Sequence, residues 1–167
     1  LDSARFRYLL SEHLTVDTES IHAFIIGEHG DSELAVWSGT NVAGIPIHDF
    51  CEFRGHYQHS DAMEAIYKRV KDSAYEIIDR KGATYYGIAM AVGHITESII
   101  RNKSSILPVS SLLTGQYGLS DLYLSIPTIV NRNGAEQVLE ISLSDPEHMA
   151  LKKSAETLQQ VIADLDL

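Results

Sequence analysis

The sequence predicts an α+β fold, with mainly antiparallel strands packed with long helices, and two observations support this prediction. Three strand-like segments follow one another late in the chain with only short turns between them, which requires antiparallel pairing. The helical segments are grouped before and after these strands instead of alternating with them. No Rossmann domain is expected in this chain, because its 11 glycines never occur as G-x-G, the core of the dinucleotide fingerprint.

Length and composition limit the class of protein. The 167 residues suit one domain, which we expect to span residues 1–167. A formal net charge of −10 without a Lys/Arg cluster argues against a nucleic-acid partner. The single cysteine, Cys51, fits a reducing compartment, and no apolar run approaches the ~20 residues that span a bilayer. The first residue is Leu1 rather than Met, so we expect a piece of a longer protein.

The first part of the chain is expected to form a helix followed by short strands. Residues 21–26 are β-branched and aromatic and predict a strand that Gly27 ends. Between residues 33 and 47, two strand-like pieces flank a turn at residues 38–41. The helix is predicted over residues 1–16 from one apolar stripe, made of Leu1, Phe6, Leu9, Leu10 and Leu14.

Two long helices are expected in the middle of the chain. Apolar residues recur with a 3.6-residue period through residues 61–81, where Asp61 and Glu64 resemble a capping box and Gly82 would end the helix. Residues 84–101 are apolar on nearly all faces. A helix of that kind is a buried one, so this segment is expected to be the central helix of the core.

The last part of the chain predicts a small sheet and a final helix. The strand candidates are residues 105–113, 122–130 and 137–143. Asn133-Gly134 lies between the last two, and this dipeptide is the strongest short signal of a hairpin. Ser144 then opens a helix with proline in its first turn.

One histidine-rich segment has the ligand types of a metal site. His48, Cys51, His56 and His59 are spaced H-x2-C-x4-H-x2-H, and zinc binds such side chains. Structural zinc sites, however, normally pair two tight knuckles across a longer separation. We therefore interpret the segment as a partly packed loop with ordinary polar histidines, and we predict no metal ion.

His29 lies in a turn directly after a predicted strand. Gly27 and Gly30 flank it, so the backbone can turn sharply and leave the imidazole accessible. A histidine in such a place can act as a general acid or base. From composition alone, a turn histidine that only caps a strand is the favoured interpretation.

The start of the first helix carries three charged residues. Asp2 and Arg5 are three residues apart and share a face, so a carboxylate and a guanidinium could point into one site. Arg7 lies about 200° further round the helix and must face elsewhere. The alternative is an exposed helix start with an aspartate at its positive end.

Four segments together resemble the L-lactate dehydrogenase family. They are LDSARFR at residues 1–7, IGEHGDS at 26–32, KGAT at 81–84 and IVNRNG at 129–134. The resemblance covers essentially the whole chain, and it implies the C-terminal, substrate-binding and catalytic half of a bacterial L-lactate dehydrogenase. The N-terminal half, which would bind NAD, and the mobile loop over the substrate have no counterpart in this chain, so the chain alone is expected to be inactive.

The resemblance implies specific roles for matching residues. His29 would donate and accept the proton at the substrate's C2 oxygen, and Asp2 would be its partner. Arg5 would clamp the substrate carboxylate, a task that suits a planar guanidinium. The implied substrate-binding set is Asp2, Ser3, Ala4, Arg5 and Thr84.

The resemblance also implies regulation and assembly. Arg7 and His22 match the pair that bacterial allosteric lactate dehydrogenases use for fructose 1,6-bisphosphate at a subunit interface. A homo-oligomer, dimer or tetramer, in the cytoplasm would follow, with a role in glycolysis and fermentation. Tyr75 matches a phosphotyrosine position, although a plain helix-surface tyrosine is the preferred interpretation.

Three alternatives remain open from the sequence. Malate or 2-hydroxyisocaproate dehydrogenase is a rival within the family, because the residue that selects the substrate side chain lies on the loop outside this chain. A non-catalytic oligomerisation module is a second alternative, and helix 61–81 could serve it. A small-molecule-binding domain without catalysis is a third, and Asp2 counts against it because carboxylate binding alone needs only Arg5.

Overall fold

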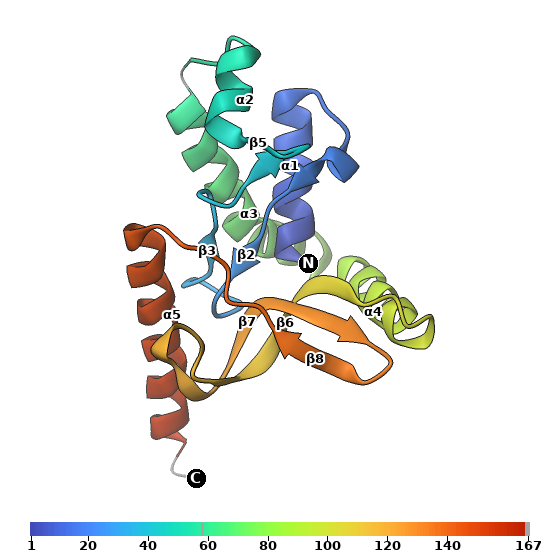
Figure 1. Cartoon of the computed structure of the whole chain (residues 1–167), viewed down its shortest axis with the longest axis vertical. Coiled ribbons are helices and arrows are strands. Elements are labelled where there is room, and N and C mark those ends of the chain that lie inside the picture. Colours follow the sequence, from blue (N-terminus) through green and yellow to red (C-terminus); the bar gives the residue numbers. More distant parts are fainter. Residues whose placement is uncertain (58, 166–167) are drawn as a thin grey trace. The chain divides into compact units, whose positions relative to one another are not determined.

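Helices and strands are grouped along the chain rather than alternating, which confirms the predicted α+β class (Figure 1). The structure is a computed structural model, and it describes residues 1–57 and 59–165. The chain divides into two units. Leu1–Ile25 and Ala35–Tyr85 form the first unit, and Ile26–Leu34 with the chain from Tyr86 onward form the second.

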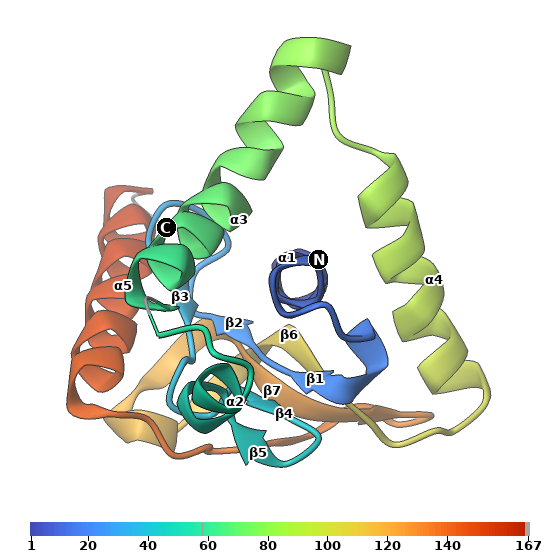
Figure 2. The same cartoon turned by 90° about the horizontal axis from the view of Figure 1, so that it is seen from above.

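The first unit is mainly helical. Its helix α1 packs against α3, and the two lie near a small antiparallel sheet of order β1-β4-β5 (Figure 2). Register pairs Ile21 with Val42 and Val42 with Ile45. The elements are α1 (Asp2–Leu14), the 3-10 turn η1 (Thr18–Ser20), β1 (Ile21–His22), β4 (Asn41–Val42), β5 (Ile45–Pro46), α2 (Ile47–Phe53) and α3 (His59–Lys81).

The predicted first helix is confirmed, and its apolar stripe forms the core of this unit. Phe6 is fully buried and packs edge-to-face on Trp37, with ring centroids 4.7 Å apart. Thr15 follows α1 in the left-handed conformation, with φ 56°, and ends it. The buried side chains around Phe6 include Leu9, Leu10, Leu14, Ile21, Val42, Ile47, Ile66 and Val70.

The single strand predicted over residues 21–26 is wrong in one respect, because it is broken into two. β1 pairs with β4, whereas β2 (Ile25–Ile26) pairs with β3 (Leu34–Ala35) in a separate two-stranded sheet. One strand cannot serve two sheets without a bend between them. The local residue types predict extended backbone but not which partner it pairs with.

The helix predicted over residues 61–81 is confirmed, with an earlier start. α3 begins at His59, so Asp61 lies inside the first turn and is not the N-cap that the predicted capping box requires. Gly82 follows the helix with φ +77° and provides the expected stop. The segment after β5, expected to be a loop, contains the short helix α2.

The second unit is built on an antiparallel sheet of order β6-β7-β8 with two helices (Figure 1). The hairpin at Asn133-Gly134 is confirmed, with Gly134 at φ +87°, and it sets β8 three residues earlier than the predicted 137–143. The elements are α4 (Tyr86–Ile100), β6 (Ser105–Thr114), the 3-10 turn η2 (Gln116–Gly118), β7 (Ser120–Asn131), β8 (Gly134–Val138) and α5 (Asp145–Asp164).

Helix α4 corrects the prediction of a buried central helix. Among its residues only Ser98 is buried, while Tyr86, Met90 and Ile100 are 70%, 76% and 73% exposed. The sequence is apolar on nearly all faces of this helix, so burial of those faces is favourable. It does not show which part of a structure covers them. The described residues of the chain leave most of α4 uncovered.

The last helix begins as predicted. The Ser144 N–H donates to the Glu147 carboxylate at 2.8 Å, and the reciprocal bond completes a capping box with proline in the first turn. Leu151 and Ala155 are fully buried, whereas Ile162 is exposed. Among the described residues, none of the helices has the length and apolar character needed to cross a bilayer.

We predict that Phe6→Ala costs about 3–5 kcal/mol of the free energy of unfolding, since it removes a fully buried aromatic ring and leaves a cavity. Phe53→Ala is the matched control, because Phe53 is 75% exposed and its loss should stay within about 0.5 kcal/mol. Denaturant unfolding measures both. Equal losses in the two variants would show that Phe6 is not the centre of this core.

Candidate active site

His29 lies on the turn between β2 and β3, and its side chain is exposed. The turn begins on the main sheet, because Gly27 and Ser125 of β7 exchange two backbone hydrogen bonds of 2.9 and 3.1 Å. The Glu28 N–H then donates to the buried Ser154 hydroxyl of α5 at 2.7 Å. Sheet and helix therefore hold the backbone immediately before His29.

The second half of the turn is hydrogen-bonded to Glu28. The Glu28 carboxylate accepts the Ser32 N–H at 3.1 Å and the Ser32 hydroxyl at 2.6 Å. The Gly30 N–H donates to the Glu28 carbonyl, and the Glu33 N–H donates to the Gly30 carbonyl. His29 is thus the exposed member of a closed, internally bonded turn, more ordered than flanking glycines alone predict.

Only glycine fits at position 27. Its φ is +95°, and a Cβ there would lie 2.7 Å from the Ser154 Oγ. That oxygen is the one that accepts the Glu28 N–H, so a side chain at residue 27 would displace the anchor of the turn. The glycine before Glu28 has a packing reason as well as a conformational one.

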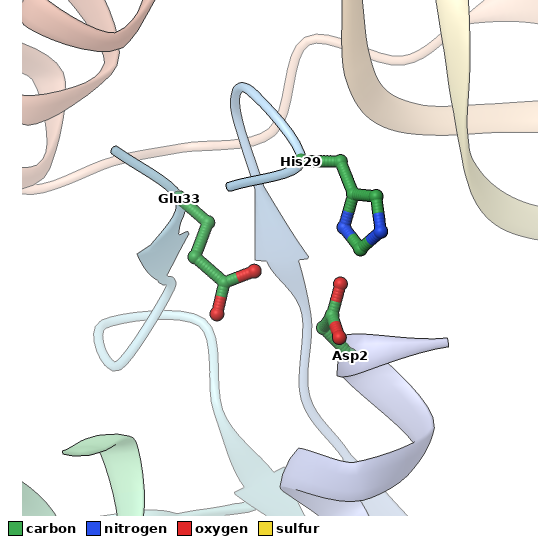
Figure 3. A group of neighbouring side chains, drawn as sticks. All are labelled: Asp2, His29 and Glu33. Carbon is green, nitrogen blue, oxygen red and sulfur yellow. The ribbon is translucent and has the colours of Figure 1, made fainter. Parts of the chain in front are cut away.

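A buried carboxylate in this turn was missed by the sequence analysis. Glu33 is only 6% exposed, and one of its oxygens lies within 4.8 Å of a ring nitrogen of His29. Figure 3 draws both side chains, which come from the segment between β2 and β3, and Asp2, which comes from the first turn of α1. The only sequence signal was a charged residue placed directly before the apolar strand β3, and such residues usually face water.

Asp2 and Arg5 share a face of α1, as their spacing predicts. The Arg5 Nη1 donates to the Asp2 Oδ1 at 2.8 Å, and the two side chains are only 17% and 12% exposed. Partial burial strengthens such an ion pair relative to one in open water. The pair is therefore a fixed, charged element at the start of the first helix.

Ser3 links the start of α1 to the strand that leads to His29. Its buried hydroxyl donates to the Ile25 carbonyl at 3.2 Å and accepts the Ile25 N–H at 2.9 Å. Both polar groups of Ile25 are thereby satisfied by one side chain. Of the other residues predicted for the substrate, Ala4 is exposed on α1 and Thr84 is half-buried just before α4.

Arg7 and Arg5 have different hydrogen-bond partners. The Arg7 Nη1 donates to the Ala23 carbonyl at 3.3 Å, and burial lowers the pKa of its guanidinium. His22, the residue before Ala23, is exposed on β1. Arg7 and His22 therefore belong to one neighbourhood of the first unit. Tyr75 is 62% exposed on α3.

The four residues of the histidine-rich segment do not come together as one ligand set. Cys51 is 1% exposed and packs in the core of the first unit, where burial raises the pKa of its thiol. His48 and His59 do meet, with Nδ1 and Nε2 2.7 Å apart. A cysteine ligand is thus excluded by packing, which spacing alone does not show.

The chain belongs to the family of the lactate/malate dehydrogenase alpha/beta C-terminal domain, whose model matches residues 1–166. The family resemblance of the sequence is thereby confirmed. It covers the chain from end to end.

Curated relatives agree with this family. The chain is 54% identical over all 167 residues to an L-lactate dehydrogenase of Acetivibrio thermocellus, of which it covers 53%. It is 54% identical to one of Thermoanaerobacter pseudethanolicus, of which it covers 54%. The chain therefore spans about half the length of the curated relatives it matches.

Solved structures show the same fold. A lactate dehydrogenase from a deep-sea metagenome library matches with a TM-score of 0.95 and 41% identity, over 99% of this chain and 53% of that one. The minor L-lactate dehydrogenase of Enterococcus mundtii, in its ligand-bound form, matches with a TM-score of 0.92 and 40% identity, over 98% of this chain and 52% of that one.

We predict that Gly27→Ala destabilises the protein clearly more than Gly44→Ala. Both positions have positive φ, and left-handed backbone costs a non-glycine residue about 1–2 kcal/mol, but only Gly27 has an atom in the way. Unfolding free energies test the difference. Hydrogen exchange at the Glu28 amide tests the cause, because Gly27→Ala should remove its protection and Gly44→Ala should not. Unchanged protection in Gly27→Ala would contradict the anchoring role of Ser154.

Proposed function

We propose that this chain is the catalytic and substrate-binding half of an NAD-dependent L-lactate dehydrogenase that interconverts pyruvate and L-lactate. One observation carries the proposal. His29 is exposed on a turn that is bonded to β7, to α5 and to itself, so an imidazole that can transfer a proton is held in a fixed place. The names of the curated relatives favour lactate over malate.

His29 serves as the general acid and base. In pyruvate reduction the imidazolium gives its proton to the ketone oxygen as C2 is reduced, and in lactate oxidation the neutral ring takes the hydroxyl proton. A carboxyl oxygen of the buried Glu33 lies within 4.8 Å of a ring nitrogen of His29, which is close enough for the two groups to interact.

The dinucleotide would be bound outside this chain. The chain has no G-x-G loop that could hold a pyrophosphate, so its residues do not fit that group. NADH would supply the hydride. This chain supplies the proton and the grip on the substrate, and by itself it is expected to be inactive.

Arg5 is proposed to clamp the substrate carboxylate. A guanidinium has five N–H donors in a planar fork, and the hydrogen bond to Asp2 Oδ1 uses only the Nη1 nitrogen. Ala4, on the same helix as Arg5, and Thr84, just before α4, are proposed to contact the substrate. Ser3 fixes the backbone at the start of α1. The Asp2 carboxylate would hold Arg5 in place.

Asp2 is also proposed as the partner that orients His29 and stabilises its charged form. Ser3, the next residue, bonds to both polar backbone groups of Ile25. His29 lies four positions after Ile25, and extended chain of that length spans about 14 Å at most. The connection limits how far the imidazole can lie from the start of α1.

Regulation by fructose 1,6-bisphosphate is proposed at Arg7 and His22, in a cytoplasmic homo-oligomer, dimer or tetramer. Arg7 donates to the carbonyl of Ala23, the residue next to His22, so the two residues lie in one part of the first unit. A chain of net charge −10 needs such local cations to attract a doubly phosphorylated sugar. Phosphorylation of Tyr75 stays a minor hypothesis, supported only by its exposure.

In the full-length enzyme, His29→Asn should lower kcat by a factor on the order of 10² to 10⁴, the usual contribution of a general acid and base. Arg5→Lys should instead raise the KM for pyruvate strongly, because a point charge replaces a two-pronged clamp. Steady-state kinetics with pyruvate and NADH separate the two effects.

The matched control is Arg80→Lys, since Arg80 forms an exposed ion pair with Glu76 on α3 and should leave both constants unchanged. If His29→Asn keeps full turnover, the alternative of a non-catalytic oligomerisation module gains support. If turnover prefers oxaloacetate or a branched 2-oxo acid, the malate or 2-hydroxyisocaproate alternative replaces lactate.

We further predict that His22→Gln weakens fructose 1,6-bisphosphate binding roughly tenfold to a hundredfold at pH 6, since a charge-assisted hydrogen bond contributes about 1.5–3 kcal/mol. Calorimetric titration of both proteins with the sugar at pH 6 measures the two affinities.

Lys68→Gln controls for net charge, because it removes a cation from an exposed ion pair on α3 and should leave the affinity unchanged. Equal affinity of wild type and His22→Gln at pH 6 would leave His22 as an ordinary strand residue. The proposed activation by a phosphorylated sugar would then lose its main support.

A further inference from the structure

A pocket in the first unit is lined largely by imidazole rings. It has a volume of about 400 Å³, and its lining includes His13 at the end of α1, His56 after α2 and His59 at the start of α3. His48 of α2 contacts His59 directly. Four histidines from three helices and one connection therefore meet in one place, and none of them is a residue proposed for catalysis.

The protonation of the central pair follows from its partners. The His59 Nδ1 lies 3.2 Å from the His56 carbonyl oxygen, which can only accept, so Nδ1 carries a hydrogen. In the neutral ring, Nε2 of His59 then has a lone pair, and it faces the Nδ1 of His48 at 2.7 Å. A single proton, carried by His48, thus lies between two nitrogen atoms that both can bind a cation.

A metal ion can take the place of that proton. Zn–N bonds are about 2.0–2.1 Å long, so two nitrogens on a tetrahedral ion stand about 3.3 Å apart. The two rings need to separate by roughly half an ångström, and His48 is exposed. The His59 N–H to a backbone carbonyl is the outer hydrogen bond that orients most metal-bound histidines.

Two further imidazoles stand on the wall of the same pocket. The rings of His13 and His56 have centroids 5.2 Å apart, and the buried Nε2 of His13 has no hydrogen-bond partner in the described part of the chain. Burial, and then the charge of His56, lower the pKa of His13, which favours the neutral form that binds metals. They are candidates for additional nitrogen ligands.

We propose that His48 and His59 bind a divalent transition-metal ion of the zinc type, and that this ion clips α2 to the start of α3. Imidazole nitrogen favours Zn²⁺, Ni²⁺ or Cu²⁺, and the described pocket lining contains no carboxylate, so Mg²⁺ and Ca²⁺ are disfavoured. The site differs from the four-residue set in the sequence, because Cys51 is buried in the core and is no ligand. Its role is structural.

Zinc titration of the full-length protein tests this proposal. After removal of metal with a chelator, calorimetry should show one Zn²⁺ bound per chain, and the melting temperature should rise with zinc concentration, because the ion binds only the folded state. His59→Gln and His48→Gln should each weaken binding at least tenfold and abolish the rise. His94→Gln, which removes an exposed histidine on α4, should change neither.

His48→Gln keeps the test decisive if His59→Gln folds poorly, because His48 is exposed and its loss disturbs no core contact. Absence of zinc binding to wild type up to millimolar concentration overturns the proposal. So does binding that survives both substitutions, and binding that is lost only with His29→Asn would place the ion at the active turn instead.

Discussion

The placement of His29 depends on a close approach in which the backbone at Gly27 touches the hydroxyl of Ser154. No other residue type fits there, since its Cβ would overlap the oxygen that anchors the next amide. The contact joins two parts of the chain more than 120 residues apart, the β2–β3 turn and α5. The small size of Gly27 and Ser154 therefore allows the contact that fixes the backbone next to His29.

Much of the fold could be predicted because it depends on local signals. The period of α3, the Ser144 capping box and the Asn133-Gly134 turn each act through neighbours in sequence, and the structure keeps all three. The misses involve distant partners. The bend between β1 and β2 reflects two sheets, and the exposure of α4 reflects what covers a helix, neither of which a local pattern contains.

The candidate site divides in the same way. Helical spacing sufficed for the Asp2–Arg5 pair and for the different hydrogen-bond partner of Arg7, because the geometry of one helix turn relates them. The roles of Glu33 and Ser154 could not be predicted from the sequence. Both residues matter because they are buried, and their burial depends on how the unit assembles. The histidine-rich segment shows a mixed case. Its ligand types were visible, but packing decides that Cys51 faces the core.

The exposed α4 has a consequence for how stability is distributed. Full burial of a large apolar side chain contributes about 1.5–3 kcal/mol, and α4 presents several of them to water, including Tyr86, Met90 and Ile100. A whole domain has a net stability of only about 5–15 kcal/mol. Covering this one helix thus involves an energy comparable to that of folding itself. The net stability of the second unit therefore depends strongly on how much of α4 stays in contact with water.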